Sequence, residues 1–446
     1  MSLTRTLAAL LTVVLAISSS AQVLQTQPAG QLAGAGQTAP LTITLQDALQ
    51  RARTNLPQFL AANTEAAIAR QDRVQARAAM LPTISYATSY LYTQGNGTPS
   101  GVFIANNAVH EYLAQGNAHE ALNLGLGQIA EYRRAGAAEA LARAKAEVAT
   151  RGLVVTVVQS FYGYVVAQRK YAIAQEAELE AGHFFEISQD LEHGGEVAHS
   201  DVIKAQLQFN DRQRDFQEAR LAMDRAGLAL AVLLFPNFSQ NFSVVDDLNL
   251  APPLASFAEV MQAAQKNNPE LRAASAALTA AQREVQVAWA AHFPSLTFDY
   301  WYGIDGTHFA TYAGGVRNLG YAAEATLNIP IWNWGALQSK VKQASLRRRQ
   351  AQVELTFAQR QLLSNIRAFY ADASTARAEL DTLRSSAGLA ADSLRLTNLR
   401  YQAGEATALE VVDAQNTLVQ ARNAYDEGEA RYRVTLANLQ TLTGSF

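Results

Sequence analysis

Glu410 and Asp413 are two carboxylates whose spacing could give them a shared role. A separation of three residues places both side chains on one face of a helix. Acid pairs at this spacing are common on solvated helix surfaces, and the spacing alone favours that simple interpretation. What the pair can do therefore depends on the elements that position it.

Other patterns that support catalysis or metal binding are missing from the sequence. Cysteine is absent, which excludes disulfides, thiolate metal ligands, cysteine nucleophiles and a lipidated N-terminal cysteine. None of the seven histidines forms a His-Glu-X-X-His motif, and no phosphate-binding glycine loop or nucleophile elbow occurs. The formal charge of -3 gives no support to a nucleic-acid partner. We therefore predict no enzyme activity, no cofactor, no metal ion and no nucleic acid.

The beginning of the chain indicates export. Arg5 precedes an apolar run that ends at Ile17, and small residues follow up to Ala21. This pattern predicts a cleaved signal peptide over 1–21, followed by a disordered leader over 22–40. No later uninterrupted apolar run reaches the ~18 residues of a spanning helix, so a membrane-bound form would have to enter the membrane as strands.

Two long stretches of the chain favour helices. Proline is absent between Ser100 and Phe235 and again after Pro330, and these stretches are rich in good helix formers. We expect helices over about 132–191 and 336–401, which would run roughly 90 and 100 Å at 1.5 Å per residue. Helices of this length exceed a globular core, so they predict coiled-coil or tubular packing.

The chain is a tandem duplication. A shift of 212 residues aligns the two halves without a gap around Pro57 and Pro269. Further on, a shift of 209 places Gly195-Glu196 on Gly404-Glu405. Agreement in both spacing and residue type makes chance a poor explanation. The predicted parts are a first repeat (41–235), an equatorial linker (236–256) and a second repeat (257–446).

Each repeat interrupts its helices with two strand candidates, at about 83–93, 118–127, 295–304 and 321–331. Apolar and polar residues alternate along them with a period of two, as in the strands of a membrane barrel. The residues predicted to face lipid are Tyr86, Tyr90, Leu296, Phe298, Tyr300, Tyr302, Leu327 and Ile329.

Two hairpins in a soluble β-domain are the alternative to membrane strands. Four strands leave two open edges, which lipid does not tolerate, and four strands are too few to close a channel. If these strands meet lipid, several chains must therefore contribute to one barrel.

Four motifs in order along the duplicated chain resemble one family, the TolC-type outer membrane factors, over about residues 41–443. They are Asn-Asn-Pro-Glu-Leu at 267–271, His-Phe-Pro-Ser-Leu at 292–296, Ile-Pro-Ile-Trp-Asn-Trp-Gly at 329–335 leading into Val-Lys-Gln-Ala, and Tyr401-X-X-Gly404 followed by Leu-Glu-Val-Val-Asp-Ala-Gln. The resemblance implies a mainly α fold with membrane β-strands. Three chains would give four strands each to a 12-stranded barrel, which a long α-helical coiled-coil barrel continues into the periplasm.

The resemblance also implies a gate at the periplasmic tip. The family's two acidic positions correspond to Glu410 and Asp413, so three chains would place six carboxylates around one constriction. Such a ring attracts cations and resists anions. Gly195 and Gly404 occupy the repeat turns near this tip.

The latch that closes this tip in the family has a partial match. Its Asp and Tyr correspond to Asp201 and Tyr401, whereas its Arg position is Ala406 here, which puts the bonding pattern in doubt. Lys204 occupies the first-repeat position of Asp413 and is a further latch candidate. We therefore expect an electrostatic gate whose charges differ between the two repeats.

The predicted function is a passive exit duct of a tripartite efflux system that exports small molecules. The expected partners are two further copies in a homotrimer, a periplasmic adaptor (membrane fusion) protein, an inner-membrane transporter and outer-membrane lipid. The expected location is the outer membrane of a Gram-negative bacterium, with a periplasmic extension and no lipid anchor. A channel for type I protein secretion, or an exported periplasmic coiled-coil scaffold without a barrel, are the alternatives. The aromatic strands favour a duct over a scaffold.

Overall fold

The computed structural model describes residues 41–92, 110–237, 241–250 and 252–444. The predicted signal peptide over 1–21 and the leader over 22–40 lie outside the described residues. The chain divides into two units after Leu41, and the second unit, Thr42–Phe446, contains the fold.

The helices of the described residues form two series of four with matching lengths. The first series is α2 (Leu45–Asn55), α3 (Pro57–Ala78), α4 (Gly127–His193) and α5 (His199–Leu234). The second series is α6 (Phe257–Asn267), α7 (Pro269–Ala290), α8 (Ala336–Gln402) and α9 (Ala408–Thr443). Both series contain 11, 22, 67 and 36 residues in that order. The prediction of a tandem-repeat, mainly helical fold is confirmed.

Local sequence signals explain where the short helices begin. Thr44 forms a capping box with Asp47 at the start of α2, and Ser256 forms the same arrangement at the start of α6. Pro57 and Pro269 are the first residues of α3 and α7, where a missing backbone N–H costs nothing. The matching Asn-X-Pro segments therefore break the chain at the same point in each repeat.

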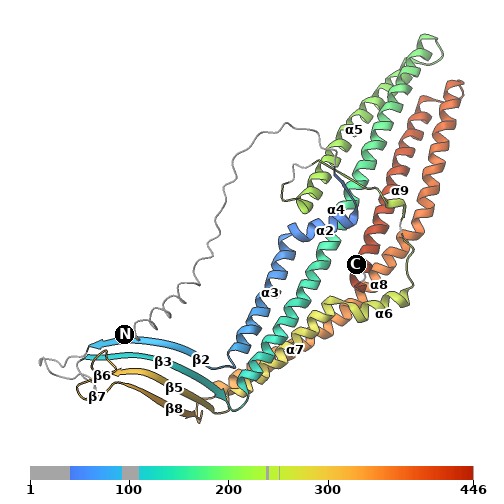
Figure 1. Ribbon diagram of the computed structural model, residues 1–446. Coiled ribbons are helices and arrows are strands. Elements are labelled where there is room, and N and C mark those ends of the chain that lie inside the picture. The colour runs from blue at the N-terminus through green and yellow to red at the C-terminus, as the bar shows by residue number, and fades with distance from the viewer. Residues whose placement is uncertain (1–40, 93–109, 238–240, 251, 445–446) are drawn as a thin grey trace, which may run out of the picture. The chain divides into compact units, whose positions relative to one another are not determined.

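Four strands form one antiparallel sheet in the order β2-β3-β5-β8 (Figure 1). These strands are β2 (Thr83–Tyr92), β3 (His110–Asn123), β5 (Ser295–Gly306) and β8 (Leu319–Asn328). The two central strands come from different repeats, so their pairing joins the repeats. Among the described residues, β2 and β8 each pair on one side only. The short strands β6 (Tyr312–Ala313) and β7 (Val316–Arg317) pair with each other.

The register of the sheet gathers most of its aromatic residues on one face, with Trp301 on the other. One row across the strands runs Tyr86, Gly116, Tyr302 and Tyr321. Residues directly opposite in an antiparallel pair share a face, so alternation puts seven predicted lipid-facing residues together. They are Tyr86, Tyr90, Leu296, Phe298, Tyr300, Tyr302 and Leu327.

The opposite face of the sheet carries most of its polar side chains, although Leu91, Leu113 and Trp301 also lie there. It carries an ion pair between His119 Nδ1 and Asp299 Oδ1 at 2.8 Å, and these residues are direct partners across β3 and β5. A sheet with one apolar and one polar face suits a boundary between lipid and water.

The sequence-based strand boundaries were wrong at two points. The strand predicted over 118–127 lies at His110–Asn123. It ends at Asn123 because the Asn123 Oδ1 accepts hydrogen bonds from the N–H groups of Gly125 (2.9 Å) and Gly127 (3.2 Å), which turn the chain into α4. The strand predicted over 321–331 ends at Asn328, and Ile329 lies beyond it. Pro330 has no N–H to continue the ladder, which explains this earlier end.

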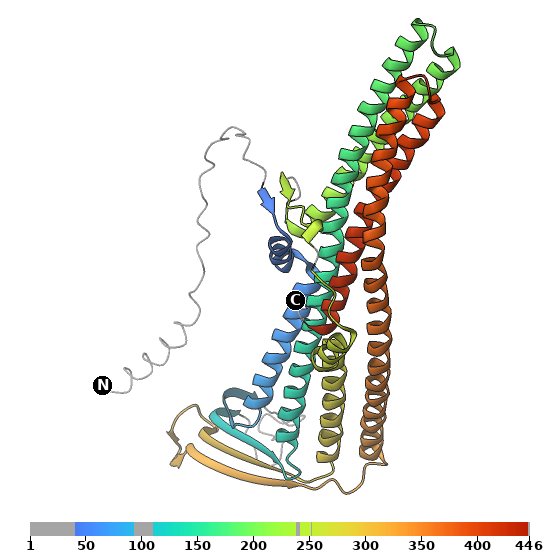
Figure 2. The same cartoon turned by 90° about the vertical axis from the view of Figure 1, so that its right-hand side faces the viewer.

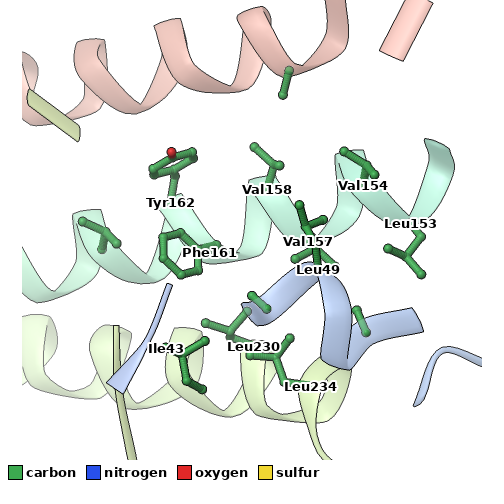
Figure 3. Close-up of a cluster of buried hydrophobic side chains, with 14 of the residues drawn as sticks. Ile43, Leu49, Leu153, Val154, Val157, Val158, Phe161, Tyr162, Leu230 and Leu234 are labelled. Carbon is green, nitrogen blue, oxygen red and sulfur yellow. The ribbon is translucent and has the colours of Figure 1, made fainter. Parts of the chain in front are cut away.

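The largest buried cluster joins α4 to α2 and α5, as Figure 3 shows. Val157 and Phe161 of α4 pack with Leu49 of α2 and Leu230 of α5, and each is at most 4% exposed. A second cluster does the same for α6, α8 and α9. Each short helix is therefore docked on the middle of a long one, which fixes the long hairpins in place.

The two long hairpins, α4–α5 and α8–α9, lie side by side and extend away from the sheet (Figures 1 and 2). None of the helices in the described part of the chain combines the length and apolarity that a membrane-spanning helix requires.

Candidate functional site

The candidate site comprises the two hairpin tips, where each long helix turns into a shorter one. At the α4–α5 tip, the Gly195 N–H donates to the Glu192 carbonyl and the Glu196 N–H to the Leu191 carbonyl, both at 2.9 Å. The corresponding bonds at the α8–α9 tip run from Gly404 to Tyr401 (3.0 Å) and from Glu405 to Arg400 (2.8 Å). This is the Schellman arrangement that ends many helices.

The glycines are essential to these turns. Gly195 and Gly404 both adopt φ 75°, in the left-handed region that glycine enters without steric cost. The two predicted turn residues therefore occupy the same backbone position in the two repeats.

Glu410 is held in place by the start of its own helix. Its Oε1 accepts hydrogen bonds from the Thr407 N–H (3.1 Å) and the Thr407 hydroxyl (3.2 Å), while the Glu410 N–H donates back to Thr407 Oγ1 at 3.4 Å. The Arg400 guanidinium lies 3.3 Å from Oε2. The bonds from Thr407, with a smaller contribution from Arg400, hold the pKa of Glu410 below its usual value. This carboxylate is therefore ionised and oriented.

Asp413, one turn further along α9, has a different environment. Its side chain is exposed and has no hydrogen bond or ion pair among the described residues. The two predicted carboxylates thus lie on one helix but differ in their hydrogen-bonding partners. Glu410 caps the helix, and the Asp413 carboxylate is free to meet an ion or another chain.

Asp201 and Lys204 occupy the same places on α5 that Glu410 and Asp413 occupy on α9. They form an ion pair with each other at 3.1 Å, three residues apart on one helix. At the start of α5, Ala198 stands where α9 has Thr407, and no side chain caps the helix. Lys204 thus offsets the charge of Asp201.

Tyr401 is part of a small core beneath the tips. It is 3% exposed, its ring centroid lies 5.1 Å from that of Phe184, and its Oη is 3.1 Å from Ser188 Oγ. The structure brings Tyr401 together with α4, and the acid of the expected latch, Asp201, is bonded to Lys204 instead. The half-buried Ala406 packs against the same core, so the position where the family has Arg carries no charge.

Sequence reasoning missed the polar partners at both tips. Arg400 pairs with Glu410, and His199 Nδ1 lies 2.7 Å from Glu192 Oε1 across the other turn. The pattern Thr407-Ala-Leu-Glu410 is a capping-box sequence and was a sufficient signal for the Thr407–Glu410 contact. The Arg400 and His199 pairs follow only from the geometry of the turns.

The tips are suited to attracting cations and to contacting other chains. The described residues contain no group of three or more His, Asp or Glu side chains arranged to hold a metal ion. Carboxylates lie on both turns, at Glu196 and Glu405, as well as on α9. The arrangement therefore supports electrostatic selection rather than bond-making chemistry.

Comparison with known proteins shows which proteins this chain resembles in sequence and in fold. The sequence model of the outer membrane efflux protein family matches residues 48–234 and 260–445. Outer membrane protein TolC of Vibrio cholerae is 24% identical over 402 residues, which cover 89% of this chain and 89% of that protein. Alkaline protease secretion protein AprF of Pseudomonas aeruginosa is 24% identical over 420 residues, 90% of this chain and 84% of that protein.

The fold is also similar to that of a solved outer membrane channel. The crystal structure of Campylobacter jejuni CmeC superimposes with a TM-score of 0.78 at 18% identity, covering 90% of this chain and 85% of that one. This likeness concerns the whole arrangement of long helices and strands rather than single residues.

Proposed function

Because the chain belongs to the outer membrane efflux protein family, we propose that three copies form the exit duct of a tripartite efflux system. The chain is a passive outer-membrane channel protein, not an enzyme. In the proposed duct, an inner-membrane transporter supplies the energy and a periplasmic adaptor protein joins it to this chain. The proposed cargo is small molecules.

The single observation that carries the proposal is the four-stranded sheet with two open edges. Within the described residues, β2 and β8 each pair with a strand on one side only, and lipid offers the backbone groups of an open edge no hydrogen-bonding partner. Because the strands alternate in direction, β8 of one copy can pair antiparallel with β2 of the next. Three copies would then close a ring of strands with the tyrosine-rich face toward outer-membrane lipid.

We propose the same residues for the gate that the sequence indicates. Glu410 and Asp413 would form the acidic ring, with Asp201, Lys204 and Tyr401 around it. The unpartnered Asp413 carboxylate and the ionised Glu410 support this assignment. Because Lys204 pairs with Asp201, these two residues would add no net charge to the ring.

We also propose the division of the chain into repeats at 41–235 and 257–446 with a linker over 236–256. In support, the linker is tied to both long hairpins through one guanidinium. The Arg169 Nη2 lies 2.8 Å from Asp246 Oδ1, and its Nη1 lies 2.8 Å from Asp426 and 2.7 Å from Glu429. Burial raises the pKa of Asp426, and the bond from Arg169 opposes this effect.

Disulfide cross-linking tests whether β2 and β8 meet between copies. The natural chain contains no cysteine, so introduced cysteines report only on each other. Ala87→Cys on the polar face of β2 would be combined in turn with cysteine at polar-face positions of β8. These positions are Gly320, Ala322, Glu324, Thr326 and Asn328. At least one pair should give covalent trimers in the outer membrane, because a disulfide requires Cα atoms within about 7 Å.

A matched control uses the other face of the same strand. Ala87→Cys with Ala323→Cys places the two side chains on opposite faces and should give no cross-link. Monomers alone in every polar-face pair would contradict the shared ring of strands. They would leave the periplasmic scaffold as the better account.

Protein secretion is the second candidate cargo, because the relative AprF is named for alkaline protease secretion. Deleting the gene in its host separates the two cargoes. Efflux predicts that susceptibility to toxic small molecules rises while the set of secreted proteins stays the same. Loss of a secreted protein with unchanged susceptibility would assign the duct to secretion.

A further inference from the structure

A cavity of about 380 Å³ lies where the two repeats meet, remote in sequence from the hairpin tips and the strands. It is partly open to solvent and is lined by the end of α2, the middle of α4, the α6–α7 turn and the end of α9. Val154 of α4, which Figure 3 shows at the edge of the buried cluster, forms part of its wall. The remaining lining is mostly polar.

Three guanidinium groups line this cavity against one carboxylate. Arg53, Arg151 and Arg272 contribute the positive charges, and Glu147 is the only acid in the lining. Arg272 Nη1 lies 3.1 Å from Glu147 Oε2, so that carboxylate is already paired. Arg53 has no ion pair among the described residues. The cavity therefore has an excess of positive charge.

Arg151 is the least compensated of the three arginines. Its Nη2 donates to the Asn267 backbone carbonyl at 3.1 Å, and it has no carboxylate partner among the described residues. Burial lowers the pKa of Arg151 to about 10, with a partial opposing effect from the nearby Glu147. A half-buried guanidinium without an anion is unfavourable, and a ligand oxyanion would relieve it.

The contrast with the other repeat shows how the cavity arises. The C-cap residue that follows α9 is Gly444, and the corresponding C-cap residue after α5 is Phe235. Phe235 is buried, and Arg51 lies over its ring at 5.3 Å, so a side chain fills the first junction. At Gly444, a Cβ would meet Arg151 Nη2 and Asn267 Cβ at 3.0 Å. The missing side chain leaves room for the Arg151 guanidinium.

We propose that this junction cavity binds a small divalent oxyanion, with Arg151 as its principal ligand and Arg53 and Arg272 beside it. Guanidinium groups bind phosphate and carboxylate oxygens through two parallel hydrogen bonds. The bound anion would link residues of both repeats at the middle of the molecule. This site goes beyond the proposed duct and does not depend on the cargo or the gate.

Calorimetric titration of the detergent-purified protein with inorganic phosphate tests the site. Sodium chloride at matched ionic strength serves as the reference, because it screens charges to the same extent as phosphate and so controls for general screening. Phosphate should bind the natural protein, and Arg151→Gln should weaken binding roughly tenfold or more, as expected for a lost charge-assisted interaction. Arg348→Gln removes an equal charge from an exposed position of α8 outside the cavity and should leave binding unchanged.

Two further variants guard against a misfolded Arg151→Gln protein. Arg53→Gln changes an exposed side chain of the lining and should weaken phosphate binding several-fold. Gly444→Ala places a methyl group against Arg151 and should also weaken phosphate binding. The proposal is overturned if phosphate has no effect beyond chloride, or if Arg151→Gln and Arg53→Gln bind as well as Arg348→Gln.

Discussion

At the α4–α5 tip, Ala198 begins the return helix without a side-chain cap and Lys204 pairs with Asp201. At the α8–α9 tip, Thr407 caps the helix, Glu410 pairs with Arg400, and the Asp413 side chain has no partner in the described part of the chain. The backbones of the two turns are nevertheless alike, with glycine at φ 75° in both. The duplicated chain thus uses one backbone solution with two different sets of charges.

Comparison of the two hairpin tips separates the residues that form the turn from the charged residues that could select ions. Glycine and the helix-ending hydrogen bonds build it, and both repeats have them. The two tips differ in how the acids at the start of the return helix are paired: Lys204 offsets Asp201 on α5, whereas Asp413 on α9 has no ion pair among the described residues. In a trimer, six hairpin tips would alternate between the two kinds.

The largest expected effect concerns Tyr401 against Glu192, which hold the same position in the two repeats. Tyr401 is buried, so Tyr401→Ala should lower the local stability of the tips by about 3–5 kcal/mol. Glu192→Ala removes a partly exposed side chain whose partner is His199 at the surface, and it should cost less than about 1 kcal/mol. Amide hydrogen exchange at the two turns measures both, and similar losses for the two variants would contradict the distinction between core and surface.

The next effect concerns ion selection. Glu410→Ala combined with Asp413→Ala should weaken block by divalent cations roughly tenfold in planar bilayer recordings, the size expected for lost charge-assisted contacts. The matched double variant Asp201→Ala with Lys204→Ala removes one charge of each sign and should change block little. Equal responses of the two double variants would show that the second tip has no special role.

The two turn glycines should respond alike. A Cβ at Gly195 or Gly404 would meet no atom within 4 Å, so only the left-handed backbone resists the change. Each substitution to Ala should cost about 1–2 kcal/mol of local stability. Hydrogen exchange at the turns gives both values, and a difference larger than that range would mean that the two backbones are not equivalent.

The smallest effect is a pH dependence confined to the α8–α9 tip. The pKa of Glu410 is lowered in the folded chain, so its stabilising contribution is present above the unfolded pKa of about 4.3 and is lost as pH falls through the lower folded value. Exchange protection at the start of α9 should therefore fall below about pH 4. Thr407→Ala removes the hydroxyl bond, the second cause of the shift, and keeps the bond from the backbone N–H, so it should weaken this dependence without abolishing it. An unchanged profile in that variant would exclude the Thr407 hydroxyl as a contributor.

The long helices could be predicted because their sequence is uninterrupted by proline and good helix formers dominate it. The start of α8 at Ala336 agrees with the prediction, whereas α4 begins at Gly127 rather than near residue 132. Leu124 and Leu126 continued the alternation of a strand, and only the Asn123 turn shows that the strand has ended. Alternation alone does not define a boundary.

Contacts between distant segments were beyond the sequence. Tyr401 and Ser188 lie 213 positions apart, and no local pattern connects them. The cavity beside Arg151 likewise depends on four segments that only the fold brings together. By contrast, the capping role of Glu410 was encoded within four residues and could have been predicted.

The central claim is that this chain forms a trimeric duct in the outer membrane. The most direct test is the mass of the detergent-extracted complex, measured by light scattering on protein recovered from the outer-membrane fraction of its native host. The account predicts three copies in one complex that opens a channel in a planar bilayer. A mass of one copy in that extract, or recovery of the chain in the soluble periplasm instead of the outer-membrane fraction, would contradict it.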